Sequence, residues 1–118
     1  MSNAFDILGD PVRRRILELL RDEPHASGEV VAVIAKEFGI TQSAVSQQLR
    51  VLREAGFASV QRDGSRRIYH MDAAPLRSVD AWLATFRSTW LPRLDALATE
   101  VARGRRERKS SGRPRNSY

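Results

Sequence analysis

The sequence predicts a mainly α-helical fold with one small β-hairpin. Two observations support this prediction: apolar residues recur at helical spacing in several segments of the 118-residue chain, and a segment of alternating polarity interrupts them between residues 58 and 71. Because 42% of the residues are apolar, the chain can build one modest core. We therefore expect a single domain over residues 1–102.

Capping residues predict where the first three helices lie. A short helical turn spans residues 4–8, and Asp10-Pro11 then supplies an N-cap followed by proline at the first helical position of a helix that runs to about Arg21. Ser27 can cap the next helix, which Gly39 ends. The residues that we expect on the inner faces of these two longer helices are Val12, Ile16, Leu19, Leu20, Val30, Val33, Ile34 and Phe38.

The next segment, residues 39–56, predicts a helix with an apolar face and a hydrogen-bonding face. Thr41 supplies an N-cap hydroxyl and Gly56 a stop. One face repeats apolar residues at i, i+4 and i+7, which is the pattern of a helix docked on a core: Val45, Leu49 and Leu52. The opposite face carries hydrogen-bonding side chains, one cation and no carboxylate: Gln42, Ser43, Ser46, Gln47 and Arg50.

Such a polar face suits contact with base edges and phosphates. The alternative is an ordinary solvated surface, but solvated helices usually mix Glu and Lys, and this one does not over its first two turns. Two helices joined by the short turn at Gly39, the second with this polar face, constitute a helix-turn-helix.

After Gly56 the alternating segment predicts a basic hairpin, with Asp63-Gly64 as its turn signal. We expect a three-residue connection that pairs Val60 with Ile68, because a tighter turn would place Val60 opposite Arg67. A basic hairpin directly after a helix-turn-helix is a wing. Its arginines would reach phosphates or the minor groove: Arg62, Arg66 and Arg67.

A long last helix is expected to begin at Asp72, with apolar residues at 3-4-3-4 spacing and a later stutter, as in a coiled-coil seam. Pro92 should kink or restart this helix. A 70-residue body cannot cover so long a stripe, so we expect a homodimer in which each subunit covers the stripe of the other. The expected interface residues are Phe5, Leu8, Leu76, Val79, Leu83, Phe86, Trp90, Leu94 and Leu97.

Charge is concentrated at the end of the chain. Residues 103–118 hold seven of the 20 Lys and Arg residues and one of the 14 Asp and Glu residues, which accounts for the whole formal net charge of +6. This tail lacks apolar periodicity, so we expect it to be disordered when free. The tail and the basic hairpin indicate a polyanionic partner. Without an 18-residue apolar run or a signal-peptide pattern, we expect a cytoplasmic, nucleoid-associated protein with no membrane partner.

Enzymatic and metal chemistry find no support in the sequence. Cysteine is absent, and the two histidines are isolated: His25 in the turn before the third helix and His70 half-buried in a strand, whereas zinc needs three or four convergent ligands. There is no phosphate loop, paired-histidine protease motif or nucleophile elbow. We therefore expect no enzyme, no metal and no cofactor. Three aromatic residues of the last helix could line a small-ligand pocket at the dimer interface, although a core role is more common: Trp82, Phe86 and Trp90.

Over residues 4 to about 100, the chain resembles the ArsR-type winged-helix transcriptional repressors of bacteria. The resemblance rests on three runs, Leu8–Leu17, Thr41–Gly56 and Gly64–Tyr69. It implies a homodimer built on the first and last helices that binds an operator in double-stranded DNA, often in its own promoter. Familiar metal sensors of this family use paired cysteines in the third helix or His and Asp/Glu clusters in the last helix. Neither occurs here, so the chain is more similar to the autorepressor branch that lacks these ligands.

The sequence thus predicts a homodimeric, sequence-specific repressor, with any small-molecule effector unknown. The residues that we expect to contact DNA are Thr41, Gln42, Ser43, Ser46, Gln47, Arg50, Arg62, Arg66 and Arg67. Two alternatives stay open. One is a winged-helix module that binds a protein partner, and the other is a nonspecific architectural protein driven by the basic tail.

Overall fold

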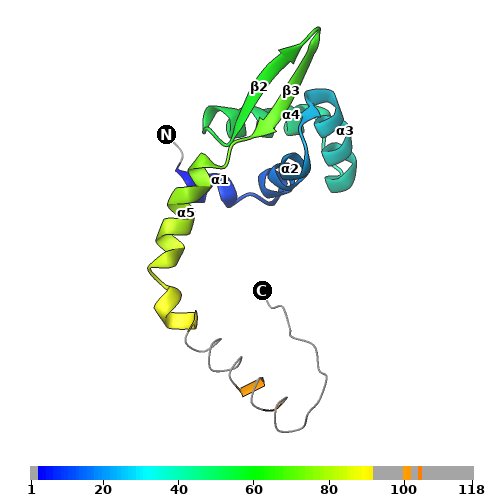
Figure 1. The fold of residues 1–118 in the computed structure, drawn as a ribbon. Coiled ribbons are helices and arrows are strands. Elements are labelled where there is room, and N and C mark those ends of the chain that lie inside the picture. Colours follow the sequence, from blue (N-terminus) through cyan, green and yellow to red (C-terminus); the bar gives the residue numbers. More distant parts are fainter. Residues whose placement is uncertain (1–2, 92–99, 102–103, 105–118) are drawn as a thin grey trace. The chain divides into compact units, whose positions relative to one another are not determined.

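The computed structural model describes residues 3–91, 100–101 and 104. The chain forms two compact units, Met1–Ala81 and Trp82–Tyr118. The elements of the first unit are α1 (Ala4–Leu8), α2 (Pro11–Asp22), β1 (His25–Ala26), α3 (Ser27–Phe38), α4 (Gln42–Glu54), β2 (Ala58–Asp63) and β3 (Arg66–Met71), followed by α5 (Ala74–Ala84), which begins in this unit (Figure 1). The mainly helical fold with a small sheet is therefore confirmed.

Local capping explains where the helices begin. The Asp10 carboxylate accepts hydrogen bonds from the Val12 and Arg13 amides, at 2.7 and 3.3 Å, with Pro11 at the first helical position of α2. The Thr41 hydroxyl accepts from the Ala44 amide at 3.0 Å and starts α4. These predicted caps are confirmed. At α3 the expected Ser27 cap is wrong, because Ala26 is the N-cap and the Glu29 carboxylate accepts from its amide.

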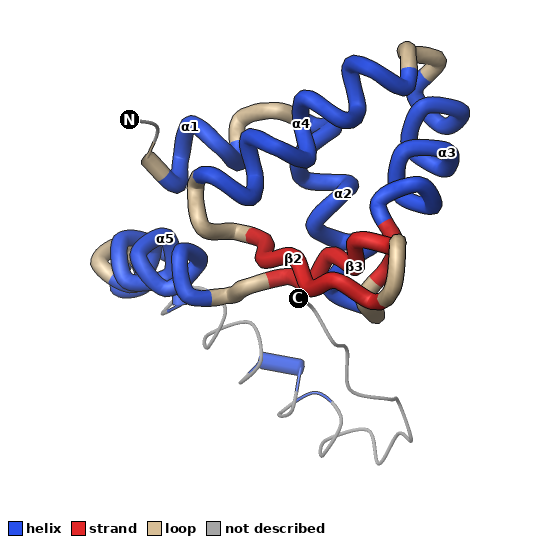
Figure 2. Tube along the Cα trace, turned by 90° about the horizontal axis from the view of Figure 1, so that it is seen from above, coloured by secondary structure: helices blue, strands red, loops and turns tan. Residues whose placement is uncertain are grey.

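The core lies where α2, α3 and α4 meet the sheet, and Figure 2 shows these three helices beside β2 and β3. The predicted apolar stripe of α4, namely Val45, Leu49 and Leu52, is fully buried. The prediction for α3 is wrong at Val33, which is 45% exposed. A helix turns about 100° per residue, so Val33 lies about 60° to one side of the buried Val30, whereas the partly buried Val31 lies on the other side, toward Ile34.

Two further differences concern α2 and the flanks of these stripes. Leu17 is buried beside Ile16 and Leu20, although its spacing did not indicate it. The predicted Val12, Leu19 and Phe38 are only partly buried and pack at the edge of the core: each belongs to the set that surrounds the buried cluster.

The sheet has three antiparallel strands in the order β1-β3-β2, not two. His25 therefore lies in a short strand opposite Tyr69 rather than in a turn. The expected hairpin register is also wrong, because Asp63 pairs with Arg66 and Val60 pairs with Tyr69. Gly64 adopts φ +66, so it can begin a two-residue turn.

The last helix ends earlier than expected. Asp72 accepts a hydrogen bond from the Ala74 amide at 3.0 Å and caps α5, as predicted. The Thr85 amide and hydroxyl both donate to the Trp82 carbonyl, at 3.1 and 2.7 Å, and this i→i−3 bonding ends the helix before it resumes over residues 87–91. The interruption is therefore at Thr85 and Phe86, and Pro92 lies outside the described residues together with Leu94 and Leu97.

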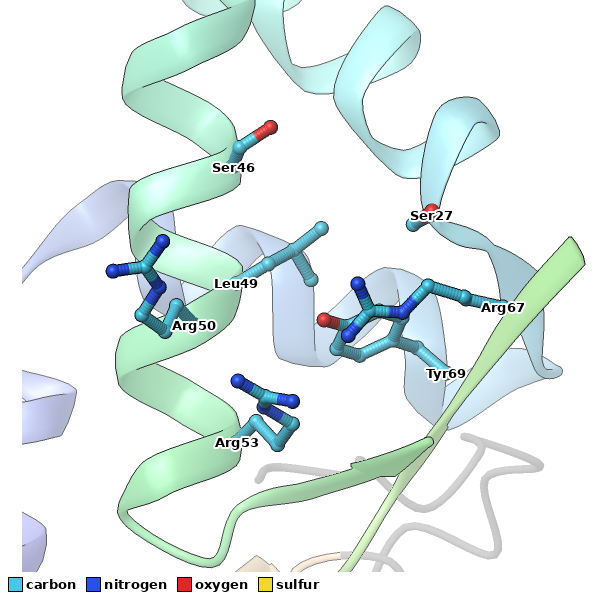
Figure 3. A pocket seen from close by; sticks show the side chains of 7 residues that line it. All are labelled: Ser27, Ser46, Leu49, Arg50, Arg53, Arg67 and Tyr69. Atoms are coloured by element: carbon cyan, nitrogen blue, oxygen red, sulfur yellow. The ribbon is translucent and has the colours of Figure 1, made fainter. Parts of the chain in front are cut away.

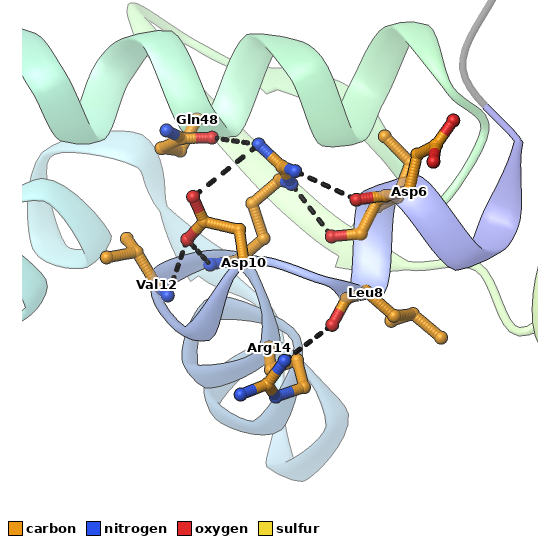
Figure 4. Close-up of polar contacts among 8 residues, drawn as sticks. Asp6, Leu8, Asp10, Val12, Arg14 and Gln48 are labelled. Carbon is orange, nitrogen blue, oxygen red and sulfur yellow. Dashed lines mark hydrogen bonds and ion pairs between the residues drawn. The ribbon is translucent and has the colours of Figure 1, made fainter.

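One arginine ties the N-terminal helix to the helix-turn-helix. The Arg13 guanidinium donates to the carbonyls of Asp6 and Ile7, at 3.0 and 2.8 Å, and to the Gln48 side-chain oxygen at 2.7 Å (Figure 4). Its side chain is only 17% exposed, and the Asp10 carboxylate lies 3.8 Å away. These bonds satisfy carbonyls at the end of α1 and anchor that helix to α4.

Of the helices in the described part of the chain, none has the combined length and hydropathy of a membrane span.

Candidate nucleic-acid interface

The outer face of α4 presents donors and acceptors without negative charge. The five residues predicted for this face are all exposed, while the apolar stripe behind them is buried: Gln42, Ser43, Ser46, Gln47 and Arg50. The first carboxylate of the helix is Glu54, at its last residue. Gln48 differs from its neighbour Gln47 because Arg13 binds it, so it is only partly exposed. The exposed face can therefore hydrogen-bond a polyanionic partner along about two and a half turns of helix.

The hairpin of β2 and β3 divides its charges between its two faces. Residues opposite each other in an antiparallel pair share a face. Arg62 lies opposite Arg67, and this pair is on the same face as the core-facing pair Val60 and Tyr69. Arg66 lies opposite Asp63 on the other face. The three predicted wing arginines are exposed, but only two of them share a face.

An acidic residue lies near the wing on the side of α3. The Ala26 amide donates to Glu29 at 3.0 Å, and this hydrogen bond is the main cause that lowers the pKa of the Glu29 carboxyl. Desolvation opposes it, and His25 and Arg66 add smaller lowering effects. His25 Nδ1 is 3.5 Å from the same carboxylate. Glu29 therefore stays ionised and lies in the field of Arg66. Arg67, on the other face of the hairpin, is the β3 arginine on the side of α4.

A cleft separates α4 from β3. Its volume is about 220 Å³, and the residues that line it come from α3, α4 and β3: Ser27, Ser46, Leu49, Arg50, Arg53, Arg67 and Tyr69 (Figure 3). Arg53 and Arg67 extend into the space between the helix and the strand from opposite sides. The sequence pattern did not indicate Arg53, Ser27 or Tyr69 as residues of the site. The available signal was the i, i+3 spacing of Arg53 from Arg50, which places both on one side of the helix.

The candidate dimer residues differ in exposure. In the second unit Leu83, Phe86 and Trp90 are 40%, 41% and 39% exposed, and the Trp82 and Phe86 rings lie 4.7 Å apart. In the first unit Phe5 is 45% exposed, whereas Val79 is partly buried and Leu8 and Leu76 pack against the core. Leu8 and Leu76 thus contribute to the fold of the single chain. Their role in a dimer interface stays a prediction.

No three His, Cys, Asp or Glu side chains gather into a possible metal site within the part of the chain that the structure describes. His70 is partly buried, as predicted, and its buried Nε2 has no hydrogen-bond partner there.

We expect DNA binding to be independent of metals, because a zinc site needs three or four convergent ligands. Adding stoichiometric zinc, arsenite, cadmium or nickel should leave the dissociation constant for operator DNA unchanged in a titration. A tenfold loss of affinity that a chelator reverses would reveal a metal site.

The comparisons with known proteins agree with this architecture. Residues 10–60 match the model of the bacterial regulatory protein arsR family. Over 86 residues, which cover 73% of this chain and 91% of the relative, the sequence is 31% identical to the transcriptional repressor SdpR of Bacillus subtilis. The chain belongs to the arsR family.

Solved structures similar to this arsR-family chain have the same fold. The crystal structure of a possible transcriptional regulator for arsenical resistance is 33% identical, with a TM-score of 0.63 over 83% of this chain and 98% of that one. The homodimeric winged helix-turn-helix DNA-binding domain of Mb0332 from Mycobacterium bovis, a possible ArsR-family transcriptional regulator, is 27% identical, with a TM-score of 0.50 over 70% of this chain and 75% of that one. The winged helix-turn-helix fold predicted from the sequence is therefore confirmed.

Proposed function

We propose that this arsR-family protein is a homodimeric, sequence-specific DNA-binding repressor, and that its own promoter contains an operator. Helix α4 enters the major groove, and the wing contacts the backbone or the minor groove. The observation that carries this proposal is the exposed, carboxylate-free face of α4 above a fully buried apolar stripe. Since its operator lies in the bacterial nucleoid, the protein acts in the cytoplasm. We assign no small-molecule effector.

The dimer is supported by two observations. Leu83, Phe86 and Trp90 expose large apolar surfaces in the single chain, and the Mb0332 domain is homodimeric. Burying such side chains against a second copy removes apolar area from water at about 25 cal/mol per Å². A two-fold dimer would also present two copies of α4 to an operator with two half-sites.

Affinity for two DNA molecules tests the proposal against its alternatives. A gel shift should show binding to the DNA upstream of the protein's own gene that is at least about a thousandfold tighter than binding to random duplex of equal length, as is typical of operators. Equal affinity for both would indicate an architectural protein. Binding to neither would favour the protein-interaction module.

The basic tail should add affinity without choosing sequence. Deleting residues 104–118 removes six Lys and Arg residues. For each DNA phosphate that is no longer neutralised, the negative slope of log K against log salt should become shallower by about 0.9. Operator and random DNA should therefore lose affinity in similar proportion, which a salt titration of both measures. If the deletion abolished discrimination between them, the tail would be reading bases.

A further inference from the structure

We propose that the cleft between α4 and β3 is a binding site for one phosphate of the DNA backbone, and that Arg53, Arg67 and the Tyr69 hydroxyl hold it. The inference rests on the proposed function, because it places a DNA strand at this point of the fold. It adds residues that the pattern of the helix-turn-helix alone does not indicate.

The chemistry of the cleft selects an anion. Three guanidinium groups and three hydroxyl groups line it, together with Leu49, and no carboxylate is among the lining residues. Every polar side chain there can donate a hydrogen bond, and guanidinium groups match the oxygens of a phosphate. Its volume of about 220 Å³ lies below the roughly 300–1,000 Å³ of cavities that enclose small organic ligands. A single phosphate group fits this space better than a nucleotide does.

Two features of the fold favour a bound anion. Arg62 and Arg67 lie directly opposite each other, and like charges in such a pair repel. Within the described residues no carboxylate oxygen lies within 4.0 Å of Arg50, Arg53, Arg62 or Arg67. A bound phosphate would neutralise part of this charge.

The second feature is the Tyr69 hydroxyl. Tyr69 is 5% exposed, and its hydroxyl points into the cleft toward Leu49 (Figure 3). No hydrogen-bond partner for that hydroxyl occurs in the described part of the chain. This oxygen is not among the buried side-chain atoms that lack a partner, so it reaches the open cleft and can donate to a ligand there.

The position of the cleft agrees with the path of a DNA strand. A phosphodiester strand separates the major groove from the minor groove of a duplex. With α4 in the major groove and the wing at the adjacent backbone or minor groove, that strand must pass between α4 and β3, where the cleft lies. The phosphate would fix the register of α4 on the operator.

The test compares R53Q, R67Q and Y69F with the wild-type protein on operator and random duplexes. The matched control is R21Q, which removes an exposed arginine from α2 that pairs with Asp22. We expect R53Q and R67Q each to weaken binding to both DNAs by about tenfold or more, because hydrogen bonds to charged groups are strong. Each should also make the negative slope of log K against log salt shallower by about 0.9. Y69F keeps the buried ring and should weaken both several-fold. R21Q should change neither affinity by more than twofold.

Uncharged methylphosphonate linkages, introduced one at a time in each half-site, then locate the phosphate. At one position per half-site, the methylphosphonate should weaken binding of the wild-type protein as much as the R53Q substitution weakens binding to unmodified DNA. R53Q itself should bind that modified DNA as well as it binds unmodified DNA. Equal further losses for R53Q at every position would overturn the site, as would unchanged binding by R53Q. Displacement of DNA by millimolar inorganic phosphate at constant ionic strength would assign the cleft to a free anion instead. Wild-type protein that binds no DNA at all would contradict the proposed function rather than the geometry of the cleft.

Discussion

Replacing Phe86 or Trp90 with alanine should convert the protein into monomers, or unfold it, and should abolish operator binding. Both side chains are about 40% exposed in the single chain, and the proposed second copy would cover them. Truncation of a fully packed aromatic residue costs about 3 to 5 kcal/mol, which is a large part of the stability of a small domain. Analytical ultracentrifugation measures the oligomeric state, and circular dichroism shows whether a monomer is still folded.

Val33→Ala is the matched control for these variants. Val33 is 45% exposed and lies on α3, outside the proposed interface, so its truncation removes exposed apolar surface without affecting the dimer. This variant should sediment as a dimer and bind operator DNA as the wild-type protein does. If the Phe86 and Trp90 variants also remained folded dimers, the interface would have to lie on another surface.

Gln47→Ala should weaken operator binding by about 1 to 3 kcal/mol and relax the preference at one base pair in each half-site. Gln47 is exposed on the first turns of α4, where helices of this motif meet base edges. Because random DNA offers no matching base, its affinity should change little. Titrations of the operator, its single-base variants and random duplex measure this difference.

The neighbouring Gln48 provides a control of the same chemistry. Arg13 binds its side chain at 2.7 Å, so Gln48→Ala should lower thermal stability without changing base preference. Arg50→Ala and Arg66→Ala should weaken both DNAs in similar proportion and flatten the salt dependence, since charge on the backbone carries no sequence information. If Gln47→Ala weakened both DNAs equally while Arg66→Ala alone changed base preference, the wing would be the reader.

Features that depend on local sequence could be predicted, because their causes lie within a few residues. Asp10 and Thr41 cap helices through their own side chains, and the buried stripe of α4 follows from 3.6 residues per turn. The hairpin register could not be derived in this way. Registers that differ by one residue place alternative side chains on the core face, and the conformation of Gly64 selects among them.

Other features depend on contacts between distant segments. Strand β1 is two residues long and exists through its pairing with β3, so no periodicity predicts it. The cleft brings Arg53 and Arg67 together from different elements, and sequence spacing within α4 cannot show what faces it. The interruption at Thr85 arises from a hydroxyl that donates to the Trp82 carbonyl. A threonine side chain can form such a bond in any helix but does not always do so, so the sequence alone does not predict it.

Protection of the DNA upstream of the protein's own gene tests the central claim most directly. Hydroxyl-radical footprinting should show two protected half-sites related by two-fold symmetry, with centres about 10 to 10.5 base pairs apart or a multiple of that spacing. The same protein on random duplex should give no defined footprint at concentrations that saturate the operator. Uniform protection along every duplex would contradict a dimeric, sequence-specific repressor. Absence of protection on all the DNAs tested, including the upstream DNA, would contradict it as well.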